Sequence, residues 1–160
     1  MINILKELKF ELVWHLIGDG PDLEKVKNIN QQLPSNITMV YHGQKSRNEI
    51  FEFYKLNHIN LFVSLSSSEG LPVSMIEALS YGIPLMSTDV GGCNEICNEQ
   101  TGFLIPKKFN HKIVSHKIEE FKSSEKNTEK FRFGCRKFWE ENFKADKNYS
   151  DFSSKIINLS

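Results

Sequence analysis

The sequence predicts an α/β fold, a Rossmann-like doubly wound parallel sheet with helices on both faces. Short apolar segments alternate along the chain with amphipathic segments of helical periodicity, as in repeated strand–helix units. Glycine or proline follows most of the apolar segments, where a strand would turn into a helix. With 160 residues, of which 39% are hydrophobic and 25% charged, the chain is expected to form a single domain over residues 1–160.

The chain opens with a helical pattern over residues 1–9, where a doubly wound domain normally opens with a strand. The first strand of the domain is therefore expected to be absent, as in a fragment of a larger protein. The apolar segment 12–17 predicts a buried strand that ends at a glycine-rich turn. A helix over residues 22–32 is expected to start just after Pro21, because proline suits the start of a helix.

Two more strands and a capped helix follow. Residues 37–41 and 60–64 are apolar runs of strand length. Between them, residues 46–57 predict a helix, because Ser46 and Glu49 have the spacing of a capping box. These elements continue the strand–helix alternation.

The second half repeats the alternation and ends in helices. A helix is expected over residues 72–81, and the tight turn Gly82-Ile83-Pro84 ends it. The remaining expected elements are a strand at 85–87, a short helix at 91–97, a strand at 103–105, and helices from His111 onward with breaks near Ser123-Ser124 and Ala145-Asp146. Right-handed crossovers between parallel strands put the strand-to-helix loops at one edge of the sheet, where ligands bind. The loops expected there are 18–21, 42–46, 64–72 and 88–92.

Composition excludes some functions. The 20 basic and 20 acidic residues cancel, so there is no overall electrostatic attraction to nucleic acid. No segment has the length of a membrane-spanning helix. Cys93 and Cys97 could share a helix face, with His111 and His116 following, but the spacing fits no standard zinc pattern. Reduced thiols of a cytoplasmic protein are the favoured interpretation.

The most informative segment is Glu69-Gly70-Leu71-Pro72, followed by Glu77. It lies between an apolar run and a helical run. Glycine lets the backbone approach a ligand, and proline tolerates the first helical position. The free N–H groups and the positive end of the helix dipole favour a phosphate. Because Glu69 and Glu77 can each accept hydrogen bonds from hydroxyl groups, the segment predicts a nucleotide site.

Several motifs, in order along the chain, resemble the group 1 (family 4) retaining glycosyltransferases. The segment with Glu69 and Glu77 is similar to the family's Glu-x7-Glu signature. The other matching motifs are Ile17-Gly18-Asp19-Gly20-Pro21, Val40-Tyr41-His42-Gly43, Ala78 to Pro84, Thr88 to Gly92 with Glu95-Ile96, and Thr101 to Pro106. The resemblance extends over roughly residues 1 to 145.

The resemblance implies the GT-B architecture, in which two Rossmann-like domains face each other across a cleft. This sequence is similar to the C-terminal, donor-binding domain alone. The implied donor is a nucleotide diphosphate sugar such as a UDP-sugar, and the implied acceptor is a sugar, lipid or glycan in polysaccharide or glycolipid synthesis. The N-terminal acceptor-binding domain is expected to be missing, as is the family's Arg and Lys pair for the diphosphate. The isolated chain is therefore expected to be inactive.

The same resemblance implies that no metal or other cofactor is needed, in agreement with the lack of an Asp-x-Asp motif. It also implies a cytoplasmic enzyme, with peripheral attachment at the inner face of the membrane as a further expectation.

The resemblance also implies roles for individual residues. Glu69 would be the catalytic residue that contacts the donor sugar, and Glu77 would contact the ribose, although a lysine or a backbone N–H is the alternative partner for a buried Glu77. The further donor-binding residues implied are Gly70, Leu71, Pro72, Val73, Gly18, Gly20, Gln44 and Lys45. A plain turn remains an alternative for the two glycines of the first loop.

Two other functions stay open on sequence grounds. A flavodoxin-like module could bind phosphate or a nucleotide without catalysis, and it would be indifferent to the sugar. A glycosidase could use Glu69 and Glu77 as acid and nucleophile, but it needs two carboxyl groups about 5 to 10 Å apart across an open cleft.

Overall fold

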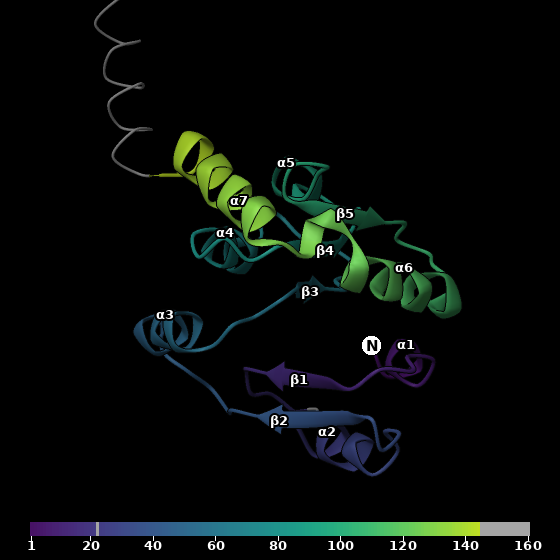
Figure 1. Ribbon diagram of the computed structural model, residues 1–160. Helices are drawn as coiled ribbons and strands as arrows, with labels where there is room; N and C mark the ends of the chain where they lie inside the picture. Colours follow the sequence, from purple (N-terminus) through teal and green to yellow (C-terminus); the bar gives the residue numbers. More distant parts are fainter. Residues whose placement is uncertain (22, 145–160) are drawn as a thin grey trace, which may run out of the picture. The chain divides into compact units, whose positions relative to one another are not determined.

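The computed structural model describes residues 1–21 and 23–144 (Figure 1). The chain divides into two compact units. Of the described residues, the first unit contains 1–56 and 109–122, and the second contains 57–108 and those from 123 to 144. Each unit has its own strands, which are all parallel, so the predicted α/β class is confirmed.

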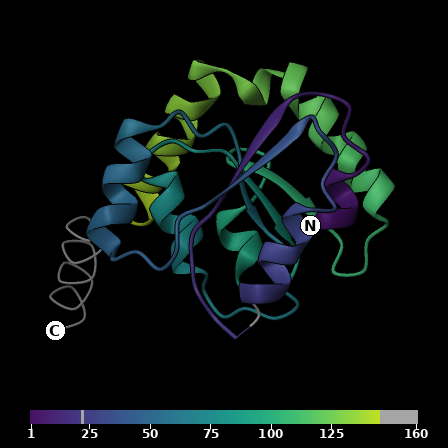
Figure 2. The same cartoon turned by 90° about the horizontal axis from the view of Figure 1, so that it is seen from below.

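The first unit contains a two-stranded parallel sheet. Its elements are α1 (Ile2–Leu5), β1 (Leu12–Leu16), α2 (Leu23–Asn30), β2 (Ile37–Tyr41), α3 (Arg47–Leu56) and α6 (His111–Ser123). β1 and β2 pair side by side along their whole length (Figure 2). The predicted capping box is present at the start of α3, because Glu49 Oε2 accepts hydrogen bonds from Ser46 N at 2.8 Å and Ser46 Oγ at 2.6 Å.

Helix α6 belongs to the first unit although it lies late in the sequence. His111 Nε2 is 3.9 Å from Glu7 Oε1, and Lys122 Nζ lies 4.6 Å from the centre of the Phe10 ring. These contacts join both ends of α6 to the segment after α1. The buried side chains of α1, α6 and the segment between α1 and β1 are Ile4, Leu5, Leu8, Val114, Ser115, Ile118 and Phe121.

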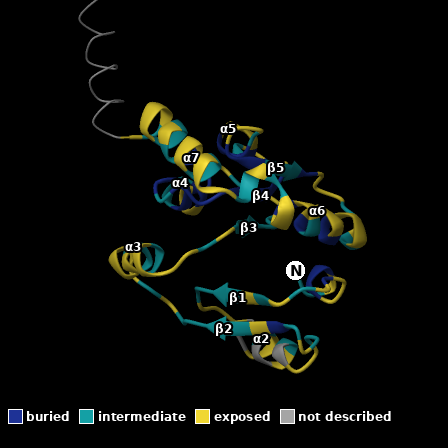
Figure 3. Cartoon of the chain, viewed as in Figure 1, coloured by how far each residue is buried: buried dark blue, intermediate teal, exposed yellow. Residues whose placement is uncertain are grey.

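The second unit contains a three-stranded parallel sheet in the order β3-β4-β5. Its elements are β3 (Phe62–Ser64), α4 (Val73–Leu79), β4 (Leu85–Thr88), α5 (Cys93–Ile96), β5 (Gly102–Ile105), the 3-10 helix η1 (Glu125–Asn127) and α7 (Glu129–Asn142). All four residues of the central strand β4 are buried, as expected for a parallel strand covered on both faces. Figure 3 shows this burial around β4, α4 and α5.

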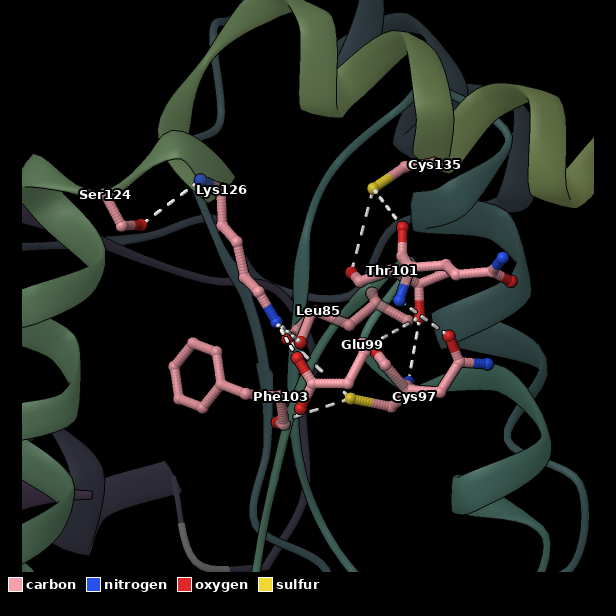
Figure 4. Close-up of polar contacts among 11 residues, drawn as sticks. Leu85, Cys97, Glu99, Thr101, Phe103, Ser124, Lys126 and Cys135 are labelled. Carbon is pink, nitrogen blue, oxygen red and sulfur yellow. Dashed lines mark hydrogen bonds and ion pairs between the residues drawn. The ribbon is translucent and has the colours of Figure 1, made fainter.

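A polar cluster at the start of β5 holds the second unit together (Figure 4). The buried Thr101 hydroxyl donates to the Ile96 carbonyl at 2.6 Å and accepts from the Asn98 N–H at 3.0 Å. Lys126 Nζ donates to Glu99 Oε2 at 2.6 Å and so joins η1 to the turn before β5. The bond from Thr101 to Ile96 satisfies two buried polar groups, which would be costly to leave unpaired.

The predicted element boundaries agree closely with the structure, with two informative differences. The strand predicted over 37–41 has those limits, whereas the strand predicted over 60–64 begins at Phe62. Of the helix predicted over 1–9, only Ile2–Leu5 is regular, and single turns continue it to Leu8. The break expected near Ser123-Ser124 is confirmed, because Ser124 caps η1 there. The break expected near Ala145-Asp146 lies outside the described residues.

Within the described residues, no helix combines the length and the apolar character that crossing a bilayer requires.

Candidate functional site

Glu69 lies in the loop that joins β3 to α4, in the second unit. Its side chain is half-buried, and its Oε1 accepts a hydrogen bond from Ser66 Oγ at 2.7 Å. The Ser66 carbonyl accepts a hydrogen bond from Thr88 Oγ1 at 2.6 Å. Thr88 ends the buried strand β4, so the carboxylate is connected to the core of the unit through two hydroxyl groups.

The loop after β4 packs directly on the backbone beside Glu69. Gly92 N donates to the Gly70 carbonyl at 2.9 Å. A Cβ atom at Gly91 would lie 1.8 Å from the Glu69 carbonyl oxygen, and Gly91 has a φ of +51°. A side chain at Gly91 would therefore be excluded both by contact and by conformation. The two glycines allow the loops after β3 and β4 to touch through their backbones.

Helix α4 begins beside this loop without a side-chain cap. Pro72 is the N-cap residue rather than the first helical residue, and it makes no side-chain hydrogen bond. The flanking side chains Leu71 and Val73 are 51% and 59% exposed. Because the first N–H groups of a helix have no intrahelical partner, this helix start has the features that favour an anion.

Glu77 lies in the second turn of α4, among residues that form the core. Its side chain is half-buried, next to the buried Ala78. Its carbonyl accepts a hydrogen bond from Ser80 Oγ at 2.6 Å, which closes the end of the helix. The structure therefore places the two predicted carboxylates in one unit, one before α4 and one within it.

The other predicted site residues lie in the first unit. Gly18, Gly20 and Gln44 line an open depression of about 610 Å³ together with Asp19. The loops are held by a hydrogen bond from Gly18 N to the Gly43 carbonyl at 2.9 Å. The structure thus brings these three predicted residues together. Lys45 does not line the depression.

Two histidines support the same loops. His15 lies in β1, and His42 follows β2 directly. Nδ1 of His15 is 2.9 Å from Nε2 of His42, and the two rings are stacked. The edge of Phe53 in α3 packs against both rings. Burial, and secondarily the neighbouring His42, lower the pKa of His15. A neutral pair can share one proton in this hydrogen bond, so the interpretation of both residues as structural fits the geometry.

The cysteines are buried thiols of the second unit. Cys97 Sγ donates to the Phe103 carbonyl at 3.3 Å, and Cys135 Sγ donates to the Thr101 carbonyl at 3.7 Å. Burial raises the pKa of Cys97 and of Cys135 to about 12. Among the residues that the structure describes, no group of three His, Cys, Asp or Glu side chains is arranged to hold a metal ion.

The motifs and the fold agree with comparisons to known proteins. A family model described as "Glycosyl transferases group 1" matches residues 1–138. The chain belongs to this family. The family expected from the motifs is thereby confirmed.

Individual relatives of this group 1 glycosyltransferase chain are longer proteins. The chain is 37% identical to the O-antigen biosynthesis glycosyltransferase WbnH of Escherichia coli over 91 residues. These aligned residues make up 57% of this chain and 24% of that protein. The structure of a glycosyltransferase from Rickettsia africae ESF-5 superposes with a TM-score of 0.76 at 21% identity, over 99% of this chain and 44% of the other. Anabaena Alr3699/HepE in complex with UDP-glucose superposes with a TM-score of 0.72 at 16% identity, over 98% of this chain and 44% of that chain.

The matched segment therefore covers about a quarter of that E. coli relative, and the superposed chain covers less than half of each of these two structures. The two structural likenesses establish the fold.

Sequence reasoning missed two residues of this glycosyltransferase chain that touch the candidate site. Ser66 and Thr88 carry the hydroxyl groups that connect Glu69 to β4. A signal was present, because a run of serines follows one predicted strand and a threonine follows the next. The bond from Thr88 to Ser66 could not be read from the sequence, because the two residues are 22 positions apart.

Proposed function

We propose that this chain is the donor-binding part of a retaining glycosyltransferase. The whole enzyme would transfer a sugar from a nucleotide diphosphate sugar to a hydroxyl group and would keep the anomeric configuration. The observation that carries the proposal is Glu69, a carboxylate held by Ser66 beside the uncapped start of α4. Family membership supports glycosyl transfer over a non-catalytic nucleotide module or a glycosidase.

In this proposal Glu69 is the catalytic residue that contacts the donor sugar through its hydroxyl groups. The diphosphate would lie at the start of α4, where Gly70, Leu71 and Val73 offer backbone N–H groups and Pro72 leaves the helix uncapped. Fixed N–H groups and the helix dipole would stabilise the charge that develops on the leaving diphosphate. No metal ion takes part in this scheme.

Glu77 would accept hydrogen bonds from the ribose hydroxyl groups. Its half-buried position in the second turn of α4 supports this role, since a position four residues into a helix lies about 6 Å along its axis from the first helical residue. A replacement by glutamine would keep the shape and remove the charge, so Glu77→Gln is the variant that tests it.

In the first unit, taken by itself, the open depression is the place where we propose that a nucleotide binds. Gly18 and Gly20 leave the depression open, and Gln44 lines it. Lys45, the next residue, is the remaining candidate for contact with the base or a phosphate. The complex of Anabaena Alr3699/HepE with UDP-glucose supports a UDP-sugar donor, and the O-antigen biosynthesis glycosyltransferase WbnH supports an acceptor in surface polysaccharide synthesis. An acceptor-binding domain in the whole protein, a cytoplasmic location and peripheral membrane attachment belong to the same proposal.

Isothermal titration calorimetry with UDP, GDP, UDP-glucose and UDP-galactose tests the proposal on the 160-residue chain. We expect one nucleoside diphosphate to bind, and its sugar conjugate to bind with a different affinity. Glu69→Gln should remove most of that difference and leave binding of the nucleoside diphosphate unchanged. Binding that ignores the sugar in the unaltered chain would instead favour the non-catalytic module.

A mass-spectrometric transfer assay with the same chain tests its inactivity. We expect no transfer product from the chain alone, and robust transfer would contradict this part of the proposal.

A further inference from the structure

We infer that Ser66 is a positioning residue that fixes the Glu69 carboxylate for the donor sugar, and that Thr88 holds Ser66 in place. The inference rests on the proposed role of Glu69 and deepens it. Ser66 Oγ lies 2.7 Å from Glu69 Oε1, the distance of a strong hydrogen bond to a charged acceptor. A glutamate side chain in a loop has several rotamers, and this bond selects among them.

The bond also gives the two carboxylate oxygens of Glu69 different roles. Ser66 occupies Oε1 of Glu69. Within the described part of the chain, Oε2 receives no hydrogen bond from the protein. Each carboxylate oxygen can accept two hydrogen bonds, so Oε2 remains available to a hydroxyl group of the ligand. Ser66 thereby sets which oxygen the sugar meets.

Thr88 connects Ser66 to the sheet of the second unit by a hydrogen bond. Its side chain is 1% exposed, and its hydroxyl donates to the Ser66 carbonyl at 2.6 Å. It ends β4, which pairs with β3 on one side and β5 on the other. Beyond Glu69 in the same loop, the Gly70 carbonyl accepts from Gly92 N. The loop is thus fixed on both sides of Glu69, by the last residue of the central strand and by the segment that follows it.

This geometry separates recognition of the sugar from recognition of the nucleotide. Ser66 touches the carboxylate that is proposed to meet the sugar, and it does not belong to the helix start proposed for the diphosphate. Loss of its hydroxyl should weaken binding of the sugar conjugate and spare the nucleoside diphosphate. A residue with only a structural role would change both affinities together.

The test compares UDP with UDP-glucose by calorimetry on the 160-residue chain. In Ser66→Ala we expect the affinity difference between the two ligands to shrink about fivefold, and in Thr88→Val about twofold. Ser66→Thr keeps a hydroxyl group and should restore most of the difference. The matched control is Ser68→Ala, an exposed serine of the same run, which should change nothing. An unchanged difference in Ser66→Ala, or an equal loss of both affinities, would overturn the inference.

A second measurement does not depend on the ligand. In protein with 13C-labelled glutamate, the NMR order parameter of the Glu69 side chain should fall in Ser66→Ala and stay constant in Ser68→Ala. If the unaltered chain binds neither ligand but Glu69 still loses order in Ser66→Ala, the proposed function fails while the positioning contact stands. If Glu69 keeps its order, the positioning inference itself is wrong.

Discussion

The loops of the two units use glycine for opposite reasons. In the second unit, a Cβ at Gly91 or Gly92 would lie 1.8 Å or 2.8 Å from a carbonyl oxygen of the loop after β3. In the first unit, a Cβ at Gly18 or Gly20 would meet no atom within 4 Å. The first pair lets backbone pack on backbone, whereas the second pair borders open space. A glycine-rich loop is therefore not by itself evidence of a ligand, because packing alone can require the glycine.

The largest effect is expected where the packing is closest. Gly91→Ala should lower the free energy of unfolding of the second unit by roughly 3 kcal/mol or more, because the added Cβ both clashes with the Glu69 carbonyl and strains a positive φ. Urea denaturation followed by circular dichroism measures this.

The matched control for that experiment is Gly134→Ala in α7. A Cβ there meets nothing within 4 Å, so alanine should stabilise the helix by up to about 1 kcal/mol. Equal effects of the two substitutions would show that Gly91 is not held against the neighbouring loop.

A smaller loss is expected at the polar cluster of the second unit. Thr101→Val keeps the side-chain shape but removes the hydroxyl that bonds to Ile96 and Asn98. We expect a loss of about 2 kcal/mol in the free energy of unfolding, since the buried Ile96 carbonyl and the part-buried Asn98 N–H each lose a partner. Thr101→Ser should recover part of it. Full stability of the valine variant would mean that these bonds contribute little.

The buried thiols predict a pH dependence for the second unit alone. The pKa of Cys97 and Cys135 is raised to about 12 from an ordinary value of 9.0, because burial disfavours the thiolate. The unfolded chain therefore loses these protons first, so the stabilising contribution is complete below pH 9 and is lost as the pH rises from 9 toward 12. Denaturation midpoints measured across this range should fall, and replacing both cysteines by alanine should flatten the decline.

The smallest change in stability is expected at the open loop of the first unit. Gly20→Ala should leave the free energy of unfolding within about 0.5 kcal/mol of its original value, because the position has room for a methyl group. If the nucleotide approaches this loop, the affinity for UDP should still fall about threefold or more. An unchanged affinity for UDP would mean that Gly20 is an ordinary turn residue, which neither packing nor a ligand requires.

Much of this organisation could be predicted from the sequence. The alternation of apolar and amphipathic segments located the strands, and the capping box of Ser46 and Glu49 formed as expected. Both are local properties, because periodicity and capping involve residues within a few positions of one another. The motif around Glu69 and Glu77 was sufficient to indicate the family, which the comparison over residues 1–138 confirms.

The sequence by itself determined the type and order of the elements, the family and the candidate carboxylates. Only the tertiary structure decided how the strands are shared between two sheets and which glycines are required by packing. It also decided that Thr88 holds Ser66, and with it the loop of Glu69. The physical reason is distance along the chain. Contacts between residues about 20 positions apart depend on how β3 and β4 lie beside each other, and no local pattern of residues records that pairing.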